Sequence, residues 1–193
     1  MYTIKNLETS ELEIKKSKFI TKLFRVNNID EVNTILNNVK KEYSDATHCC
    51  YAYIVDNIKK SSDDGEPGGT AGIPILQVLE KQNLNYVLCV VIRYFGGIKL
   101  GAGGLVRAYT KSVSDLIKSI NLIELISGVK VKLNTTYDEQ KKLDYILKNI
   151  KVEKEFDDNV TYLIDISKDN LDLLQNYNYK IIDEIYIEKE PIN

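Results

Sequence analysis

The sequence has few of the residues that build metal centres and disulfide frameworks. Its 193 residues include one histidine and three cysteines, Cys49, Cys50 and Cys89. An odd number of cysteines, with no CxxC spacing and no pair of histidines, supports neither a disulfide framework nor a zinc site. All three cysteines lie in apolar, strand-like runs. We therefore predict buried thiols that behave as small hydrophobic side chains, and we expect no metal and no cofactor.

Long apolar runs are also missing. No stretch approaches the roughly 18 apolar residues of a membrane span, and the start of the chain, from Met1 to Lys16, lacks the apolar run of a signal peptide. We therefore expect a cytoplasmic protein with no membrane partner.

Neither sign of charge dominates. The chain has 26 basic and 28 acidic residues and a net charge of -2. This balance excludes a surface that is basic throughout, so any RNA binding has to be local. With 44% apolar residues, the chain is able to build real hydrophobic cores.

Glycine is scarce outside one region. Nine of the ten glycines lie between Gly65 and Gly104, and the tenth, Gly128, stands where the sequence changes character. Residues 1–124 carry 16 basic and 14 acidic side chains, whereas residues 125–193 carry 10 and 14. We therefore predict two domains, 1–124 and 125–193, and expect the first to meet any anionic partner.

The hydrophobic pattern of the first domain predicts an α+β fold. The expected elements are, in order, strand structure within 12–26, a helix capped by Asn28 with Glu31 three residues on, a strand at 48–55, a loop at 58–72, a short helix opened by Pro74, a strand at 86–94 and a long helix from Leu105. The strand at 86–94 is apolar almost throughout, which is typical of burial on both faces. We expect a β-α sandwich with its helices on one face of the sheet.

The second domain has a simpler pattern. The expected elements are a strand at 129–133, a helix with a capping box of Thr136 and Glu139, two strands on either side of a turn at 157–159, a helix at 169–178 and a strand at 181–188. This order, β-α-β-β-α-β, is that of a ferredoxin-like fold.

A Gly-rich loop between a strand and a helix is the first candidate site. It matches neither a Walker loop nor the dinucleotide GxGxxG motif. A strand, a flexible loop and a helix start nevertheless aim free backbone N–H groups and the positive end of the helix dipole at one point. The predicted anion-binding residues are Arg93, Lys99, Gly101, Gly103, Gly104 and Arg107. In the alternative interpretation, the glycines only permit tight turns and close packing, and the cations are solvated.

An acidic turn is the second candidate site. Asp63, Asp64 and Glu66 stand together, as in a turn that binds a metal or a basic partner. Because no spaced set of further ligands accompanies them, we predict that they bind a partner together with His48, and no metal. In the alternative interpretation, Asp63 and Asp64 cap the turn while Glu66 is exposed.

Two further ideas concern residues beside these segments. His48 with a neighbouring cysteine suggests a nucleophile and its base, but Cys49 and Cys50 point to opposite faces of a strand, so at most one of them lies beside a pocket. Tyr94 and Phe95 offer a stacking surface for single-stranded RNA. Because they end an apolar strand, we favour a place in the core for them.

Five segments carry a resemblance to a known family. They are residues 45–48 (DATH), 50–53 (CYAY), 63–67 (DDGEP), 69–72 (GTAG) with 74–76 (PIL), and 93–109 (RYFGGIKLGAGGLVRAY). In these segments the chain resembles the YigZ/IMPACT family, with the match running from about Ser17 to Tyr109. The family usually has Asn where Cys49 stands and Ser where Gly68 stands, so we assign no polar side-chain role to either position.

The resemblance implies both a fold and a function. It implies that the first domain has the fold shared by the second domain of a ribosomal small-subunit protein and by small-molecule kinases, and that the second domain is similar to a late domain of elongation factor G. It also implies eukaryotic relatives that regulate translation by competing for an activator of the starvation-sensing kinase. We therefore expect a non-enzymatic, translation-associated regulator that binds RNA, the ribosome or a translation-factor protein.

The alternative is an enzyme that acts on a phosphorylated small molecule or nucleotide bound at the Gly-rich loop. In that case Lys99 or Arg107 would be the electrophile, and Asp64 or His48 would be the acid-base residue.

Overall fold

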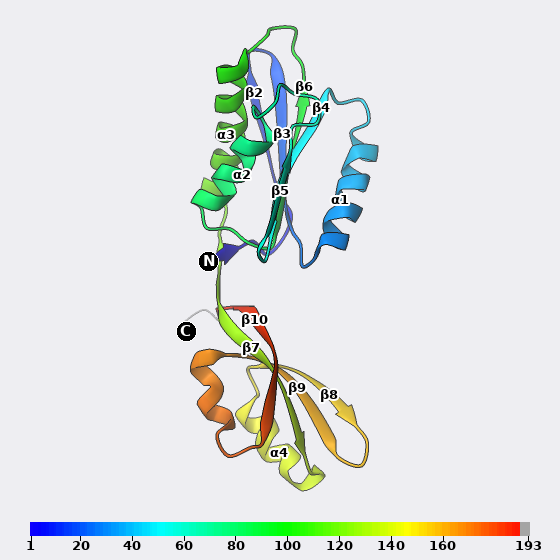
Figure 1. Cartoon of the computed structure of the whole chain (residues 1–193), viewed down its shortest axis with the longest axis vertical. Coiled ribbons are helices and arrows are strands. Elements are labelled where there is room, and N and C mark those ends of the chain that lie inside the picture. The colour runs from blue at the N-terminus through cyan, green and yellow to red at the C-terminus, as the bar shows by residue number, and fades with distance from the viewer. Residues whose placement is uncertain (190–193) are drawn as a thin grey trace. The chain divides into compact units, whose positions relative to one another are not determined.

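The computed structural model describes residues 1–189, and contacts within the chain divide it into a first unit, residues 1–123, and a second unit that begins at Glu124 (Figure 1). The first unit contains β1 (Tyr2–Thr3), β2 (Glu8–Ile14), β3 (Ser17–Arg25), α1 (Ile29–Glu42), β4 (His48–Val55), β5 (Ile58–Ser62), α2 (Gly72–Lys81), β6 (Val87–Tyr94) and α3 (Ala102–Lys118). The strand β7 (Ile123–Thr135) begins at the last residue of the first unit, and the rest of it belongs to the second unit. The second unit also contains α4 (Tyr137–Ile146), β8 (Lys151–Phe156), β9 (Val160–Ser167), the 3-10 helix η1 (Lys168–Leu174) and β10 (Tyr179–Glu188). The chain is therefore a two-domain α+β protein.

The first unit is built on an antiparallel sheet in the order β2-β3-β6-β4-β5. Strand β6 is the central strand, and every residue from Val87 to Arg93 is buried. Side chains alternate between the two faces of a strand, so a strand buried along its whole length needs cover on both faces.

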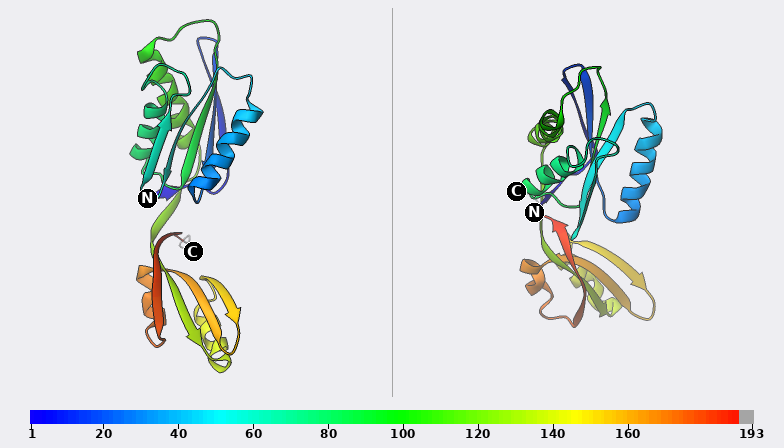
Figure 2. Two further views of the ribbon diagram at one scale, coloured as in Figure 1. Left: turned by 45° about the vertical axis from the view of Figure 1, so that its right-hand side comes forward. Right: turned by 45° about the horizontal axis from the view of Figure 1, so that its top comes forward.

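Helices cover both faces of this sheet (Figure 2). Helices α2 and α3 close one core, where Ile75 and Val113 pack with Cys89. Helix α1 closes the other core, where Val32 packs with Val90. The expectation of helices on one face only was wrong, because the apolar stripe of α1 buries the face that α2 and α3 leave open.

The local predictions for this unit hold in most places. Asn28 caps α1, with its side-chain oxygen accepting a hydrogen bond from the backbone N–H of Glu31 at 2.9 Å. The loop expected at 58–72 was wrong in its first part, because residues 58–62 form β5. Val55 pairs with Ile58 across a two-residue hairpin turn, which brings the polar sequence of β5 to the edge of the sheet.

In the second unit, β10, β7, β9 and β8 lie side by side in that order, each pair antiparallel. The inward faces of β7 and β9 pack on α4, where Val131, Ile164 and Leu143 are fully buried. The elements follow one another as expected, and the helix expected at 169–178 is the 3-10 helix η1, which ends at Leu174. Asp and Asn side chains in this segment compete for backbone hydrogen bonds, which disfavours an α-helix.

The predicted capping box of α4 was also wrong. The side chain of Thr136 makes no capping hydrogen bond. Instead the preceding residue, Thr135, donates its hydroxyl to the carboxylate of Glu139 at 3.0 Å. The acidic residue therefore has the expected place, but its partner lies one residue earlier.

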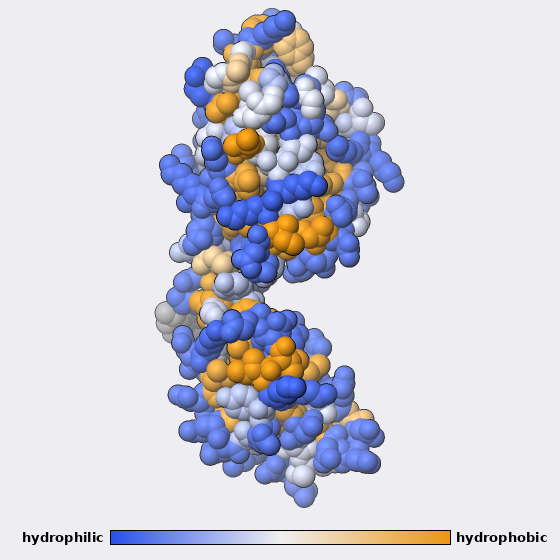
Figure 3. Space-filling model, in the orientation of Figure 1, coloured by the Kyte–Doolittle hydropathy of each residue, from blue (hydrophilic) through white to orange (hydrophobic). Residues whose placement is uncertain are grey.

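No helix among residues 1–189 is both long and apolar enough to cross a bilayer. The face shown in Figure 3 carries apolar patches bordered by hydrophilic side chains. Large exposed apolar side chains of the first unit include Ile73, Phe95, Ile98 and Val106.

Candidate functional site

The acidic turn after β5 is tied to the start of α2. The Oδ1 atom of Asp63 accepts hydrogen bonds from the backbone N–H groups of Ala71 (2.9 Å) and Gly72 (2.8 Å), and its Oδ2 atom accepts one from Gly69 (2.8 Å). Burial alone would raise the pKa of Asp63, but the three hydrogen bonds outweigh it and lower the pKa. Asp63 therefore caps α2, in agreement with the capping alternative. Both of its carboxylate oxygens already accept hydrogen bonds, so neither is free for the partner that the sequence predicted.

Asp64 joins this turn to two other elements. Its Oδ1 atom accepts from the ammonium of Lys40 on α1 at 2.9 Å, and its Oδ2 atom accepts from the backbone N–H of Cys49 on β4 at 2.7 Å. Burial works against the charged carboxylate, but these two partners lower the pKa of Asp64 overall. The carboxylate predicted to bind a partner is thus already paired.

Glu66 is the best-buried acid of the turn, with its side chain 3% exposed. Its Oε1 atom accepts from Arg93 Nη1 at 2.6 Å and from the Tyr109 hydroxyl at 2.8 Å. The capping alternative predicted an exposed Glu66, and this was wrong. The chain turns inward at Gly65, where φ is +86°, and carries Glu66 between β6 and α3.

Arg93 was predicted to bind an anion, and the structure corrects this. The residue is 5% exposed, and Glu66 compensates its charge. Its Nη2 atom donates to Ser17 Oγ at 3.4 Å, and its guanidinium carbon lies 5.6 Å from the ring centres of both Phe19 and Phe95. The position in β6 explains the burial, because Arg93 pairs in register with Phe19 on one side and with His48 on the other.

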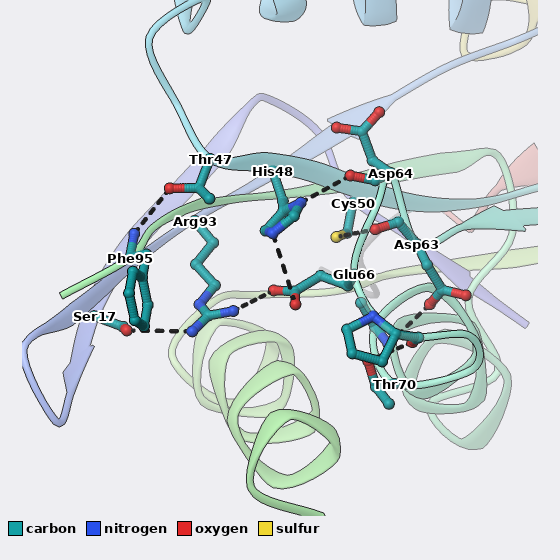
Figure 4. A network of polar contacts seen from close by, with 12 residues as sticks. Ser17, Thr47, His48, Cys50, Asp63, Asp64, Glu66, Thr70, Arg93 and Phe95 are labelled. Atoms are coloured by element: carbon teal, nitrogen blue, oxygen red, sulfur yellow. Dashed lines mark hydrogen bonds and ion pairs between the residues drawn. The ribbon is translucent and has the colours of Figure 1, made fainter. Parts of the chain in front are cut away.

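His48 stands at the centre of this network (Figure 4). Its Nδ1 atom lies 2.9 Å from the carbonyl oxygen of Asp64, and its Nε2 atom lies 3.8 Å from Glu66 Oε2. The side chain is 19% exposed. Four of the predicted residues, His48, Asp64, Glu66 and Arg93, are therefore brought together, but as one mostly buried network.

The thiols are unsuited to nucleophilic catalysis. Cys50 donates its S–H to the carbonyl oxygen of Asp63 at 2.9 Å, and its sulfur lies 3.3 Å from the hydroxyl oxygen of Tyr109. Burial raises the pKa of Cys50 to about 12 and also raises the pKa values of Cys49 and Cys89. All three cysteines are free and buried, as predicted. Within residues 1–189, no cluster of His, Cys, Asp or Glu side chains is arranged to hold a metal ion.

A second group of residues lies where β6 leads into α3. A Cβ atom at Gly96 would come within 1.9 Å of the carbonyl oxygen of Lys16, so the loop after β6 lies directly against the β2–β3 turn. The backbone N–H of Gly96 donates to Ser17 Oγ at 3.2 Å, and that of Phe95 donates to Thr47 Oγ1 at 2.9 Å. The contact places Lys15 and Lys16, both exposed, beside the loop.

The start of α3 is open. Gly101, with φ at +72°, precedes the helix, and no side chain caps the first turn. A Cβ atom at Gly101 would find no other atom within 4 Å, whereas one at Gly104 would meet Leu100 at 3.1 Å. Gly101 therefore leaves the backbone accessible, and Gly104 permits close packing.

The two remaining predicted cations are at this end. Arg107 bends back over the first turn of α3, because its Nη1 atom lies 3.5 Å from the position of a Cβ at Gly103. Lys99 is exposed in the loop itself. Neither these two cations nor Lys15 and Lys16 form an ion pair with any residue that the structure describes.

An aromatic ring completes this surface. Phe95 is 46% exposed, so the expectation that it lies in the core was wrong. The neighbouring Tyr94 donates its hydroxyl to Asp45 at 2.9 Å, which places an acid at one border. We refer to Lys15, Lys16, Phe95, Lys99 and Arg107 as the basic apex; Figure 1 shows the β2–β3 turn, the loop and the start of α3 at the same end of the first unit.

Sequence reasoning missed the contribution of the β2–β3 turn. Lys15 and Lys16 have φ values of 47° and 64°, which is uncommon for residues with a side chain. Two adjacent lysines are not among the dipeptides that mark a two-residue hairpin, such as Asn-Gly or Gly-Gly, so the turn itself carries no clear sequence signal. Its approach to Gly96 also depends on the pairing of β3 with β6, which no local pattern shows.

Comparison with known proteins gives a consistent result. Residues 15–117 match the family described as Impact N-terminal domain. A Bacillus subtilis protein named IMPACT family member YvyE is 49% identical over 126 residues, covering 64% of this chain and 58% of its own length. A Haemophilus influenzae IMPACT family member is 35% identical over 170 residues, covering 84% of this chain and 82% of its own length.

A solved structure shows a similar fold over nearly the whole chain. The crystal structure of a hypothetical protein superposes with a TM-score of 0.72 at 27% identity, covering 94% of this chain and 97% of the other.

Proposed function

The chain belongs to the IMPACT family, and from that premise we propose that it is a non-enzymatic, translation-associated regulator that binds RNA, including ribosomal RNA, at the basic apex. The observation that carries the proposal is that four exposed cations, which form no ion pair within residues 1–189, lie on segments at the same end of the first unit as one exposed aromatic ring. The link to translation is supported by the family resemblance, which implies that the eukaryotic relatives regulate translation.

The chemistry of the basic apex suits a phosphate backbone. Lys15, Lys16, Lys99 and Arg107 provide positive charge, and none of them is paired with an acid within residues 1–189. The open first turn of α3 adds backbone N–H groups and the positive end of the helix dipole. Phosphate contacts of this kind supply affinity without sequence preference.

Phe95 favours a single strand over a duplex. A base stacks on an exposed aromatic face when it is not already stacked within a helix. The guanidinium of Arg93 lies 5.6 Å from the ring centre, and the backbone of Phe95 is held by Thr47, so the ring is preorganised. The contact we expect is therefore one unpaired base on Phe95, with its flanking phosphates on the cations.

The enzymatic alternative has less support. It required Asp64 or His48 as a general acid or base beside Lys99 or Arg107. Both carboxylate oxygens of Asp64 are occupied by Lys40 and the Cys49 amide, and His48 faces Glu66 rather than the basic apex. Within residues 1–189, no contact joins Asp64 or His48 to Lys99 or Arg107.

The proposal is tested by measuring the affinity for a 12-nucleotide single-stranded RNA and co-sedimentation with ribosomes. We expect Lys15→Ala with Lys16→Ala, and Lys99→Ala with Arg107→Ala, each to weaken RNA binding on the order of tenfold at about 0.1 M salt. Phe95→Ala is expected to cost about 1 to 3 kcal/mol for the single strand.

The matched control is Lys60→Ala with Lys81→Ala, which removes two exposed cations of the same unit outside the basic apex. If the apex variants bind RNA and ribosomes as tightly as this control, the proposal fails. If RNA binding is absent but the apex variants lose a translation-factor protein from ribosome fractions, the surface binds protein instead of RNA.

A further inference from the structure

The second unit has a corner where the turn between β8 and β9 meets the start of α4. Tyr137, the first residue of α4, donates its hydroxyl to the carbonyl oxygen of Asp157 in that turn at 2.7 Å. The turn is closed by the backbone N–H of Asp157, which donates to the carbonyl oxygen of Asn159 at 3.0 Å. The hydroxyl of Tyr137 therefore fixes its ring against the turn.

Two large aromatic rings are exposed at this corner. Tyr137 is 51% exposed, and Phe156, the last residue of β8, is 60% exposed. Phe156 pairs in register with Val160, so both side chains lie on the same face of the sheet. Val160 is fully buried in the core with α4, whereas Phe156 is not, so the core ends at Val160. Single exposed apolar residues are ordinary on protein surfaces, but adjacent rings form a contact surface.

Carboxylates accompany these rings. Residues 135–140 and 155–160 contain five acidic residues and no basic residue. All five are exposed, and none of them forms an ion pair within residues 1–189. We refer to the two rings and these five acids as the acidic corner; the acids are Asp138, Glu139, Glu155, Asp157 and Asp158.

Local structure explains the acids better than the rings. The positive end of the α4 dipole favours Asp138 and Glu139 in its first turn, and aspartates are common in turns. Neither effect requires a tyrosine and a phenylalanine in water beside them. The rings are therefore the part of the acidic corner that calls for a partner.

The combination of rings and acids selects the chemistry of that partner. Carboxylates repel the phosphates of a nucleic acid, and the excess of acids in residues 125–193, 14 against 10 basic residues, favours a basic partner. An arginine side chain suits both features, because its guanidinium stacks on an aromatic ring while its N–H groups donate to carboxylates. The first unit contains this arrangement internally, with the guanidinium of Arg93 5.6 Å from the ring centre of Phe95 and Nη1 2.6 Å from Glu66.

We propose that the acidic corner is a docking surface for an arginine-rich segment of a partner protein. One guanidinium packs on the ring of Tyr137 or Phe156, and neighbouring arginines of the segment pair with the carboxylates. The surface belongs to the second unit and takes a cation, so this contact is separate from RNA binding at the basic apex.

The probe is a peptide of about ten residues that alternates arginine and glycine. It is titrated into the full chain at about 0.1 M salt, and the backbone amides are followed by NMR. We expect saturable shifts at residues 136–139 and 155–159. The same peptide with citrulline, which keeps the planar group and loses the charge, should bind at least about tenfold more weakly. A lysine version should bind more weakly as well, since an ammonium group does not stack.

The contribution of the rings is tested by substitution. Tyr137→Ala with Phe156→Ala should weaken peptide binding by about tenfold. Tyr137→Phe keeps the ring and loses only the hydrogen bond to the turn, so its binding should stay within about threefold of the wild type. The matched control is Tyr145→Ala, which removes a ring of α4 that is 78% exposed but stands one turn from Lys141 and Lys148. This variant should bind the peptide as the wild type does.

The contribution of the carboxylates is tested by the salt dependence. Asp157→Asn with Asp158→Asn should weaken peptide binding and make it less sensitive to salt. Asp169→Asn with Asp172→Asn removes two exposed acids of the same unit outside the acidic corner and should change neither quantity.

Several results would overturn the proposal. They are equal affinity for the citrulline peptide, no saturable shift at the acidic corner up to about 1 mM peptide, and peptide binding that the two-ring variant retains or that Tyr145→Ala loses to the same extent. Shifts at the acidic corner on adding a 12-nucleotide RNA, or on raising the protein concentration without peptide, would also overturn it, because RNA or a second copy would then be the occupant. The two-ring variant is expected to keep its affinity for RNA, so this proposal and RNA binding at the basic apex stand or fall separately.

Discussion

Arg93 shows how the role of a residue depends on a distant partner. At the end of β6 and before a glycine loop, an arginine has the position of a ligand-binding cation. In the structure, Arg93 instead forms an ion pair with Glu66, which lies 27 residues earlier in the chain. Its Nη1 atom is 2.6 Å from Glu66 Oε1. The sequence analysis grouped Arg93 with Lys99 and Arg107 because they are close in the sequence. In the structure, the pairing of β6 with β4 brings Arg93 beside His48 instead.

The buried pair leads to the first prediction. Arg93→Ala leaves the carboxylate of Glu66 buried with only the Tyr109 hydroxyl as donor. Removing one partner of a buried pair costs about 3 to 5 kcal/mol, and we expect a loss of that size in urea-induced unfolding. The comparison is Lys111→Ala, which breaks an exposed pair with Asp115 and is expected to cost less than about 1 kcal/mol. Similar stabilities of the two variants would contradict the compensation of Arg93 by Glu66.

At the scale of elements, the strands were easier to predict than the caps. The predicted strand at 48–55 is β4, because β-branched and aromatic residues fill it. The cap of α2 could not be predicted from the sequence. The capping residue is Asp63, which lies nine residues before Gly72 and not next to the helix. A helix cap that reaches across a loop leaves no pattern at the helix start.

The cap of α2 gives the second prediction. Asp63→Asn turns one acceptor oxygen into an N–H group that faces the Gly69 amide, and we expect a loss of about 1 to 2 kcal/mol at neutral pH in thermal or urea unfolding.

The same substitution changes the acid sensitivity. The folded-state pKa of Asp63 is lowered, so its contribution is present above the unfolded value of about 3.9 and is lost as the pH falls through the folded value. The wild-type protein should therefore lose stability below about pH 4 more steeply than Asp63→Asn. The exposed substitution Asp115→Asn serves as the reference; an acid profile of Asp63→Asn as steep as that of this reference and the wild type would argue against the cap.

Gly96 carries the third prediction, which concerns the link between the loop and the β2–β3 turn. In Gly96→Ala the new methyl group would lie 1.9 Å from the Lys16 carbonyl, so the turn has to move. We expect a loss of about 1 to 3 kcal/mol or more, with NMR shifts concentrated at Lys15 and Lys16. Gly68→Ala is the control, since its Cβ meets nothing within 4 Å. A Gly96→Ala variant as stable as Gly68→Ala would show that the loop does not press on the turn.

At the scale of the whole molecule, charge is distributed unevenly along the chain. Residues 1–124 have 16 basic and 14 acidic side chains, and residues 125–193 have 10 and 14. The sequence alone shows this asymmetry, which favours the first half as the part that meets an anion. The sequence did not show which cations stay unpaired, because pairs such as Lys40 with Asp64 form between different elements.

The fourth prediction follows from counting the unpaired cations. Each phosphate contact with a single strand contributes about -0.7 to the slope of log affinity against log salt concentration. If Lys15, Lys16, Lys99 and Arg107 each neutralise one phosphate, the slope for single-stranded RNA is about -3. Lys15→Ala with Lys16→Ala should reduce the slope to about -1.4. Lys130→Ala with Lys132→Ala removes two cations of the second unit and should leave the slope unchanged. A slope that decreases equally in both pairs would mean that RNA is attracted by the overall charge of the chain, and the basic apex would then have no special part in binding.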